Sequence, residues 1–284
     1  MIPAAFEYHR PADISAALAI LDEHGDEARV IAGGHSLIPM MKLRMADIEH
    51  LVDLQDIGEL KGISVDGTKV MIGAMTTQHE LIESADIASV APILHEAALQ
   101  IADPQVRYMG TVGGNVANGD PGNDMPGLMQ CLGATFHLVG SGGTRDVAAR
   151  DYYEAAYMTD REDDEILTGI SFDAPEGGYA YEKQKRKIGD YATAACAAIV
   201  RIEGGVCTAA SIAMTNLSDT PVYSAEAGDA LVGTACDTAA IDAAVAAATG
   251  AIDPTEDNRG PVDFKMHVAG TIIRRAIERA ISRA

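Results

Sequence analysis

Tryptophan is absent from this chain of 284 residues, and aromatic residues make up only 5% of it. The core must therefore consist mainly of Ala, Val, Ile, Leu and Met. No uninterrupted apolar run reaches the roughly 18 residues that a membrane-spanning helix needs, so no integral membrane segment is expected. The N-terminus has no signal-peptide pattern, because Glu7 and Arg10 interrupt any apolar stretch. We therefore expect a cytoplasmic protein.

The chain has few cysteines, and their spacing does not match that of a metal or iron–sulfur site. The four cysteines, none of which forms a CxxC pair, are Cys131, Cys196, Cys207 and Cys236. Such spacing fits neither a zinc site nor an iron–sulfur cradle. We expect reduced thiols and no metal site in this chain.

Basic residues are half as numerous as acidic ones, 21 against 42, which gives a net charge of −21. A chain this acidic repels nucleic acid and anionic membranes as a whole, so neither is expected as a partner. Solubility alone is an equally good reason for the charge. The net charge does not exclude a local basic pocket for an anionic ligand.

The length suggests about two domains, and 48% hydrophobic with 22% charged residues is typical of a globular protein. In residues 1–55 a helix capped by Asp13, a strand at 29–32 and a strand at 50–53 predict an α/β subdomain. A second subdomain, 56–176, has the following expected elements: strands at 69–73, 134–139 and 166–172, and helices at 88–101 and 125–132.

A Pro/Gly-containing linker at 174–178 separates this first domain, residues 1–176, from a second domain, residues 177–284. The second domain begins with an alternating pattern of residues, typical of a strand, and its later part is rich in alanine. Its expected elements are a three-stranded antiparallel sheet from 179–185, 194–202 and 206–214, and helices at 224–232, 237–249 and 263–283.

Two double-glycine turns are the strongest candidates for a binding site: residues 32–36 (AGGHS) and 111–115 (TVGGN). The second lies within residues 110–124, where five glycines and no apolar period predict a long functional loop. Glycine lets a ligand approach the backbone, and successive N–H groups can bind an anion. Two such loops could hold a diphosphate from both sides. Either loop alone is more often just a tight turn.

Neither loop matches the GxGxxG or GK[ST] patterns of Rossmann and P-loop proteins. Instead, three segments resemble the FAD-binding medium subunits of molybdenum hydroxylases, the family of xanthine dehydrogenase-type and carbon monoxide dehydrogenase-type enzymes. The segments are AGGHSLIPMMKLR (32–44), TVGGNVANGDPGNDMP (111–126) and YEKQKRKIGDYA (181–192). The last one is most similar to the carbon monoxide dehydrogenase branch.

The resemblance implies an α+β fold: a vanillyl-alcohol-oxidase-type FAD-binding domain of two α/β subdomains, followed by a C-terminal α+β domain. It also implies FAD as the cofactor. The residues implied to bind it are Ala32, Gly33, Gly34, His35, Ser36, Leu37, Thr111, Gly113, Gly114, Asn115, Asp120, Asp124, Lys183, Lys185 and Tyr191. No catalytic residue is expected in this chain.

Within that set the two glycine loops would hold the diphosphate, and Asp124 would accept hydrogen bonds from the adenosine ribose. A cation near the flavin ring stabilises its reduced anion, and Lys183 and Lys185, with Arg186 as the alternative, are the candidates. Tyr191 would stack on the ring. The residues alone leave other interpretations open: a helix cap for Asp124, a solvated strand edge for the lysines and a core aromatic for Tyr191.

The resemblance further implies an electron-transfer role. A large molybdopterin subunit would oxidise the substrate, a small subunit would pass electrons through two [2Fe–2S] clusters, and this chain would deliver them to an external acceptor. The implied assembly is a dimer of heterotrimers, with carbon monoxide as the first expected substrate and an N-heterocycle or aldehyde as the second. Two alternatives are a stand-alone FAD-dependent oxidoreductase and a non-redox nucleotide-binding module.

Overall fold

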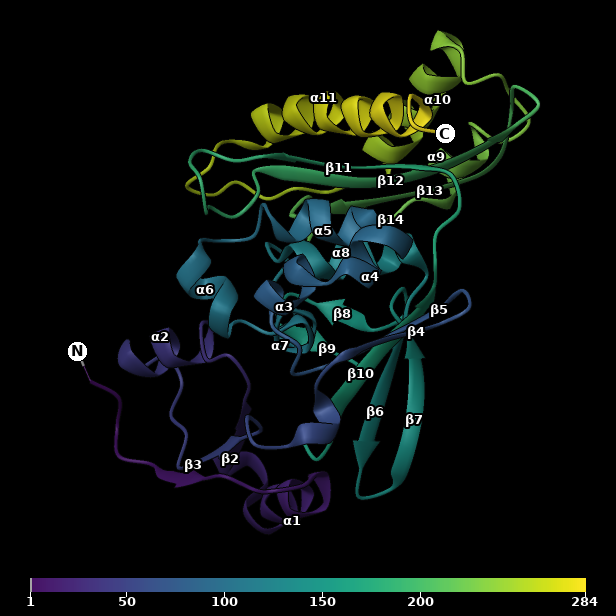
Figure 1. Cartoon of the computed structure of the whole chain (residues 1–284). Coiled ribbons are helices and arrows are strands. Elements are labelled where there is room, and N and C mark those ends of the chain that lie inside the picture. Colours follow the sequence, from purple (N-terminus) through teal and green to yellow (C-terminus); the bar gives the residue numbers. More distant parts are fainter. Residues whose placement is uncertain (1) are drawn as a thin grey trace.

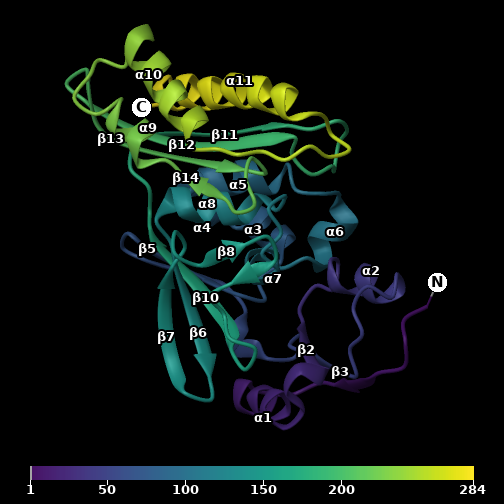
Figure 2. The same ribbon diagram turned by 180° about the vertical axis from the view of Figure 1, so that it is seen from behind.

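The computed structural model describes residues 2–284, and Figures 1 and 2 show its layers of sheet and helix from opposite sides. The N-terminal part is a parallel three-stranded sheet in the order β1-β3-β2. Its elements are β1 (Glu7–His9), α1 (Ile14–His24), the 3₁₀ helix η1 (Gly25–Glu27), β2 (Ala28–Ile31), α2 (Leu37–Lys42) and β3 (His50–Asp53). Asp13 caps α1 through the N–H of Ala16, as predicted.

The middle of the chain forms a five-stranded antiparallel sheet in the order β4-β5-β10-β6-β7, with a helical layer beside it. The strands are β4 (Ile63–Asp66), β5 (Lys69–Gly73), β6 (Thr135–Gly140), β7 (Gly143–Ala148) and β10 (Ile166–Asp173). The hairpin of β8 (Tyr153–Ala155) and β9 (Met158–Thr159) forms a separate two-stranded sheet. The helices are η2 (Gly58–Leu60), α3 (Gln78–Glu83), α4 (Ala85–Val90), α5 (Pro92–Ala98), α6 (Pro104–Met109), α7 (Val112–Ala117) and α8 (Asp124–Leu132).

Two sequence-based expectations for this part are wrong. The single helix expected over 88–101 is divided into α4 and α5, because Pro92 cannot continue a helix and instead begins α5. The loop expected over 110–124 contains helix α7, whose first turn is capped by the Thr111 hydroxyl. The sequence did not predict this helix, because its glycines add no apolar side chain to the helical pattern. Gly113 instead packs directly on the backbone of Ala74.

The C-terminal sheet has four antiparallel strands, not the expected three, in the order β11-β12-β13-β14. The additional strand has only two residues, too few to produce a sequence pattern. The elements are β11 (Gly178–Gln184), β12 (Ala194–Glu203), β13 (Val206–Thr215), β14 (Val222–Tyr223), α9 (Ala225–Asp229), α10 (Thr238–Gly250) and α11 (Val262–Ile281).

Strand β12 lies between two hydrophobic cores. Ala195, Ala197 and Ile199 belong to the core that also contains α5, α8 and the five-stranded sheet. The alternating residues Cys196 and Ala198 belong to the core under α10 and α11. In Figure 1 the long helix α11 covers one face of this sheet, and α5 and α8 lie under the other. The C-terminal sheet therefore shares its core with the helices of the preceding part.

Among residues 2–284, no helix combines the length and the apolar character that crossing a bilayer requires.

We expect Gly178→Ala to lower the free energy of unfolding by about 1–3 kcal/mol, the usual cost of overpacking. A Cβ at this buried first residue of β11 would overlap the carbonyl oxygen of Ala280 and lie 2.5 Å from the backbone nitrogen of Ala284, which would lift the end of α11 from the sheet. Urea-induced unfolding measures the loss.

The matched control is Gly250→Ala, at the end of α10, where an added Cβ meets nothing within 4 Å. It should leave the stability unchanged or slightly raised, because alanine favours the helix. Equal unfolding midpoints for the two variants would contradict the close packing of α11 on β11.

Candidate functional site

A cleft of about 940 Å³ lies where the N-terminal sheet, the helical layer and the C-terminal domain meet. The loop after β2, helix α7 and strand β11 supply parts of its wall. Of the fifteen residues implied to bind FAD, all except Asp120 and Lys185 line the cleft. The fold thus brings together three segments that are far apart in the sequence.

The loop at 32–36 presents free backbone donors to this cleft. Gly34 has φ 73°, a conformation that favours glycine, and α2 begins directly after Ser36. In the part of the chain that the structure describes, no backbone carbonyl accepts a hydrogen bond from the N–H groups of Gly33, Gly34, His35 or Ser36. Successive unpaired N–H groups in such a turn form an anion-binding concavity.

The second glycine motif is built differently, because its N–H groups are used within the protein. Val112 donates to the carbonyl of Thr76 (2.8 Å), and Gly113 donates to that of Ala74 (2.9 Å). The N–H of Gly114 donates to the Thr111 hydroxyl oxygen at 3.0 Å. This motif therefore offers the cleft a close surface and the free proton of a hydroxyl group, and not a second set of amide donors.

Close approach of the two loops requires glycine at their contact. A Cβ on Gly33 would overlap the carbonyl oxygen of Met109 and lie 2.7 Å from the Cα of Gly110. A Cβ on Gly114 would lie 2.8 Å from the Thr111 hydroxyl oxygen and 3.3 Å from the Cβ of Ala32. Larger side chains at either position would separate the loops or fill the space between them.

Asn115 fixes the start of α8. Its side-chain oxygen accepts a hydrogen bond from the N–H of Met125 at 3.1 Å, and its carbonyl accepts one from the Asn123 amide at 2.8 Å. The side chain thus holds the end of the loop in place and positions Asp124, the first residue of α8.

Asp124 forms a buried ion pair with Lys183 of β11, with 2.7 Å between Oδ2 and Nζ. The exposed fractions of the two side chains are 6% and 1%. The hydroxyl of Tyr181 donates to Oδ1 of the same carboxylate at 2.5 Å. Burial, together with the nearby Asp124 charge, raises the pKa of Tyr181 well above its usual value, so this phenol stays a donor.

The sequence interpretation placed Asp124 and Lys183 at opposite ends of an extended dinucleotide. The two side chains are instead in direct contact, and both line the cleft. Lys185 follows β11 and stands beside the cleft, where burial and the neighbouring Lys183 charge lower its pKa. Arg186 pairs with Asp190 and does not line the cleft.

Tyr191 lies on the cleft wall with 42% of its surface exposed. Burial of its hydroxyl and the nearby Asp120 carboxylate raise its pKa to about 12, so the phenol is neutral near pH 7. Asp120 itself accepts a hydrogen bond from the N–H of Gly122 at 2.9 Å and shapes the loop under this ring. An exposed aromatic face of this kind can stack on a planar ligand.

Gln78 is a lining residue that the sequence did not reveal. It is the first residue of α3 and only 2% exposed, yet neither its side-chain nitrogen nor its side-chain oxygen has a hydrogen-bond partner. Buried amides normally have partners, so a polar ligand in the cleft is the natural one. In the sequence Gln78 is an ordinary residue of a helix start, and no local signal marks it.

The arrangement suits a long ligand with an anionic group and a planar ring. The residues that line it supply unpaired N–H groups, a buried lysine, an exposed tyrosine and an unsatisfied amide. His35 is an exposed residue that lines the cleft. His79 does not line it, and its ring lies tilted against that of Tyr108, with 3.9 Å between the ring centroids. These two histidines do not converge on a shared centre.

Comparison with known proteins gives matches along nearly the whole chain. Residues 4–174 match the family described as the FAD binding domain in molybdopterin dehydrogenase. Residues 179–280 match the CO dehydrogenase flavoprotein C-terminal domain.

Among individual relatives, the carbon monoxide dehydrogenase medium chain of Afipia carboxidovorans is 58% identical over 100% of this chain and 99% of its own. The corresponding chain of Hydrogenophaga pseudoflava is 45% identical over the same shares. A solved structure of a cyanide-inactivated Cu,Mo-CO dehydrogenase contains a chain with a TM-score of 0.98 and 58% identity, with 100% of both chains covered.

We expect Lys183→Met to lower the free energy of unfolding by about 3–5 kcal/mol, because it leaves the Asp124 carboxylate buried without its cation. The double variant Asp124→Asn/Lys183→Met removes both charges and should recover a large part of that loss. Urea unfolding of Asp124→Asn, Lys183→Met and the double variant gives the coupling free energy between the two residues.

The control is Arg10→Met, which breaks the exposed 2.6 Å pair with Asp56. About half of each of these side chains is in solvent, so the loss should stay below about 1 kcal/mol. If the two single losses at the buried pair simply add in the double variant, the residues are not energetically paired.

Proposed function

The chain belongs to the family of FAD-binding subunits of molybdopterin dehydrogenases, and we propose that it is the electron-transferring FAD subunit of a carbon monoxide dehydrogenase. The observation that carries this proposal is 58% identity, over the full length, to a carbon monoxide dehydrogenase medium chain. In this proposal the chain does not bind the substrate of the complex. It receives electrons from one partner and passes them to an external acceptor.

The residues of the cleft fit FAD in its charge, size and polar groups. The N–H groups of 33–36 would hold the diphosphate, with the Thr111 hydroxyl as a further donor, and Gly114 would let the ligand approach the backbone. The orphaned amide of Gln78 would gain its missing partners. When bound, FAD accepts and releases electrons, while this chain binds and orients it.

At the other end of the cleft, Lys183 and Lys185 would place positive charge near the flavin ring, and Tyr191 would cover one face of it. Asp124 would then act by positioning Lys183 through the ion pair. Its predicted hydrogen bonds to the adenosine ribose are the alternative to this role. The ion pair offsets part of the desolvation cost of this lysine, whose side chain is almost fully buried. We further propose that residues 1–176 have the vanillyl-alcohol-oxidase-type arrangement and that the protein is located in the cytoplasm.

The assembly in this proposal is a dimer of heterotrimers. A small subunit with two [2Fe–2S] clusters would donate electrons to this chain, and a large molybdopterin subunit would oxidise the substrate. The relatives' names support the multi-subunit arrangement, since both are medium chains of carbon monoxide dehydrogenases.

The decisive experiment is anaerobic reduction of the chain co-expressed with its two partner subunits. Bleaching of the flavin absorption by carbon monoxide supports the proposal, whereas bleaching only by an N-heterocycle or an aldehyde assigns the complex to another branch. A bound flavin that none of these reduces favours a non-redox nucleotide-binding module. Substrate oxidation by the isolated chain would indicate a stand-alone oxidoreductase.

We expect Gly114→Val to abolish FAD binding, because its side chain would occupy the space between the two glycine loops. The measurement is the ratio of flavin absorption to protein, after addition of FAD to a sample whose circular dichroism is unchanged. Gly250→Ala, remote from the cleft, should bind about one FAD per chain like the wild type. Stoichiometric FAD in the Gly114 variant would refute the assignment of this loop.

Gln78→Met should raise the unfolding free energy of the FAD-free chain by about 1–3 kcal/mol, since it removes an unsatisfied buried amide. The same change should weaken FAD binding by about tenfold, the equivalent of one hydrogen bond. Unfolding by urea and fluorescence titration with FAD measure the two effects.

The contrasting variant is Gln100→Met, whose wild-type amide already donates to the carbonyl of Tyr181 at 3.2 Å. It should lose stability and not gain it. A destabilised Gln78→Met chain with unchanged FAD affinity would show that this amide has no role in the cleft.

A further inference from the structure

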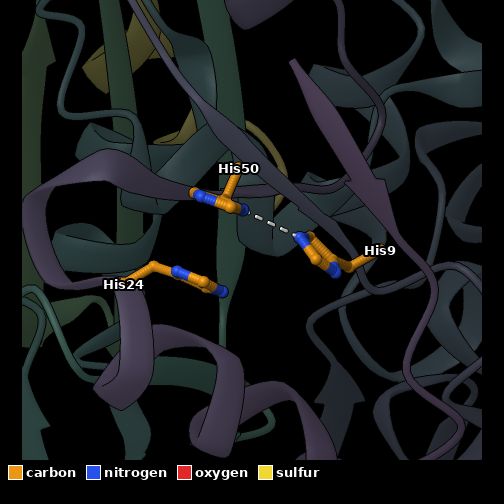
Figure 3. A group of neighbouring side chains, drawn as sticks. All are labelled: His9, His24 and His50. Carbon is orange, nitrogen blue, oxygen red and sulfur yellow. Dashed lines mark hydrogen bonds between the residues drawn. The ribbon is translucent and has the colours of Figure 1, made fainter.

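Three histidine rings, none of them from a residue that lines the cleft, meet on the N-terminal subdomain (Figure 3). They come from the end of β1, the end of α1 and the start of β3: His9, His24 and His50. Each offers a ring nitrogen, and these atoms all lie within 4.8 Å of one another. All three residues are half-buried, so the rings are held in place and still reachable from solvent.

The fold, and not the sequence spacing, creates this cluster. Strands β1 and β3 are parallel neighbours, with Glu7 opposite His50. Helix α1 runs back along the sheet and ends at His24, where Gly25, with φ 50°, turns the chain into η1. Two strands and one helix end therefore deliver one imidazole each to the same place.

The distance between two of the rings already suits a shared ion. Nε2 of His9 and Nδ1 of His50 are 3.1 Å apart. Two nitrogens bound at about 2.0–2.1 Å to one tetrahedral Zn²⁺ are separated by about 3.3 Å. Without an ion this contact is a hydrogen bond in which one of the two nitrogens must carry the proton.

The third ring needs a small rotation. His24 stacks on His50 with 3.6 Å between ring centroids and an interplanar angle of 9°. Parallel rings direct their lone pairs side by side, so one of them must turn about its Cβ–Cγ bond to meet a common ion. That torsion is broad and soft in histidine, and both residues are only half-buried.

The surroundings favour a cation. Oε2 of the exposed Glu7 lies 3.7 Å from Nδ1 of His50, close enough to become a fourth ligand after a side-chain rotation. Carboxylates also stand next to the histidines in the sequence, at Glu23 and Glu49, within a chain whose net charge is −21. A negative field of this kind raises the local concentration of cations.

We propose that His9, His24 and His50 form a binding site for a divalent transition-metal ion, Zn²⁺ foremost, with Glu7 or water as the fourth ligand. Imidazole nitrogens select Zn²⁺, Cu²⁺ or Ni²⁺ over Mg²⁺ and Ca²⁺, which prefer oxygen ligands. The ion would cross-link β1, β3 and the end of α1. These elements support β2, whose end leads into the loop at 32–36, so the ion would stabilise one wall of the cleft.

The test is calorimetric titration of the full chain with ZnCl₂ near neutral pH, after treatment with a chelator. We expect one equivalent to bind and the thermal midpoint of unfolding to rise with it, since a ligand that binds only the folded chain stabilises it. His24→Asn and His50→Asn should each weaken binding at least about tenfold, because each removes one ligand. MgCl₂ in place of ZnCl₂ should give neither heat nor a shift.

The matched control is His267→Asn on α11, an exposed histidine outside the cluster, which should bind Zn²⁺ like the wild type. If the His50 variant fails to fold, the more peripheral His9→Gln replaces it, with unchanged circular dichroism as the criterion. Titration with Co²⁺ adds a direct readout, since coordination by imidazoles in a tetrahedral site gives visible absorption bands. Equal Zn²⁺ affinity in the wild type and the His24 and His50 variants, or no binding by the wild type, would overturn the proposal.

Discussion

The buried ion pair between Asp124 and Lys183 is the interaction on which the site depends most. It joins the start of α8 to β11, and so connects the helical layer to the C-terminal sheet at the wall of the cleft. Removing two charges from water is costly, and their attraction offsets that cost only with good geometry and further hydrogen bonds. The Tyr181 hydroxyl supplies one to Asp124, and the carbonyl of Gln100 accepts one from Lys183 at 3.3 Å. Both members of the pair therefore have further hydrogen-bond partners within the buried site.

The two glycine motifs contribute to the cleft in different ways, although they look alike as sequence. The loop at 32–36 leaves its N–H groups free. Those of 112–114 donate hydrogen bonds inside the protein, to the carbonyls of Thr76 and Ala74 and to the Thr111 hydroxyl oxygen. The glycines of the second motif serve close packing, because Gly113 lies against Ala74 and Gly114 beside Ala32. An anion would therefore gain its backbone hydrogen bonds from one side of the cleft and a close, small surface from the other.

The side of the cleft that α7, α8 and β11 form relies on a core that crosses the domain boundary predicted from sequence. Strand β12 sends alternate side chains into the core shared with α5 and α8 and into the core under α11. A further polar contact reinforces the connection, because Glu96 of α5 accepts hydrogen bonds from Arg279 and Arg283 near the end of α11. The C-terminal part thus holds Lys183 at a fixed place relative to helix α7 and the second glycine motif, which a loosely tethered domain would not do.

Features that arise from near neighbours could be predicted from the sequence: helix α1 from its Asp13 cap and apolar spacing, strands β3 and β5 from short apolar runs, and the three motifs of the family. The sequence alone did not predict helix α7, the fourth strand of the C-terminal sheet, the partner of Asp124, the orphaned amide of Gln78 or the meeting of three histidines. Asp124 and Lys183 are 59 positions apart, and His9 and His50 are 41 apart. Sequence patterns depend only on residues that are near one another along the chain. Contacts such as these form only when distant segments pack together and exclude water between them.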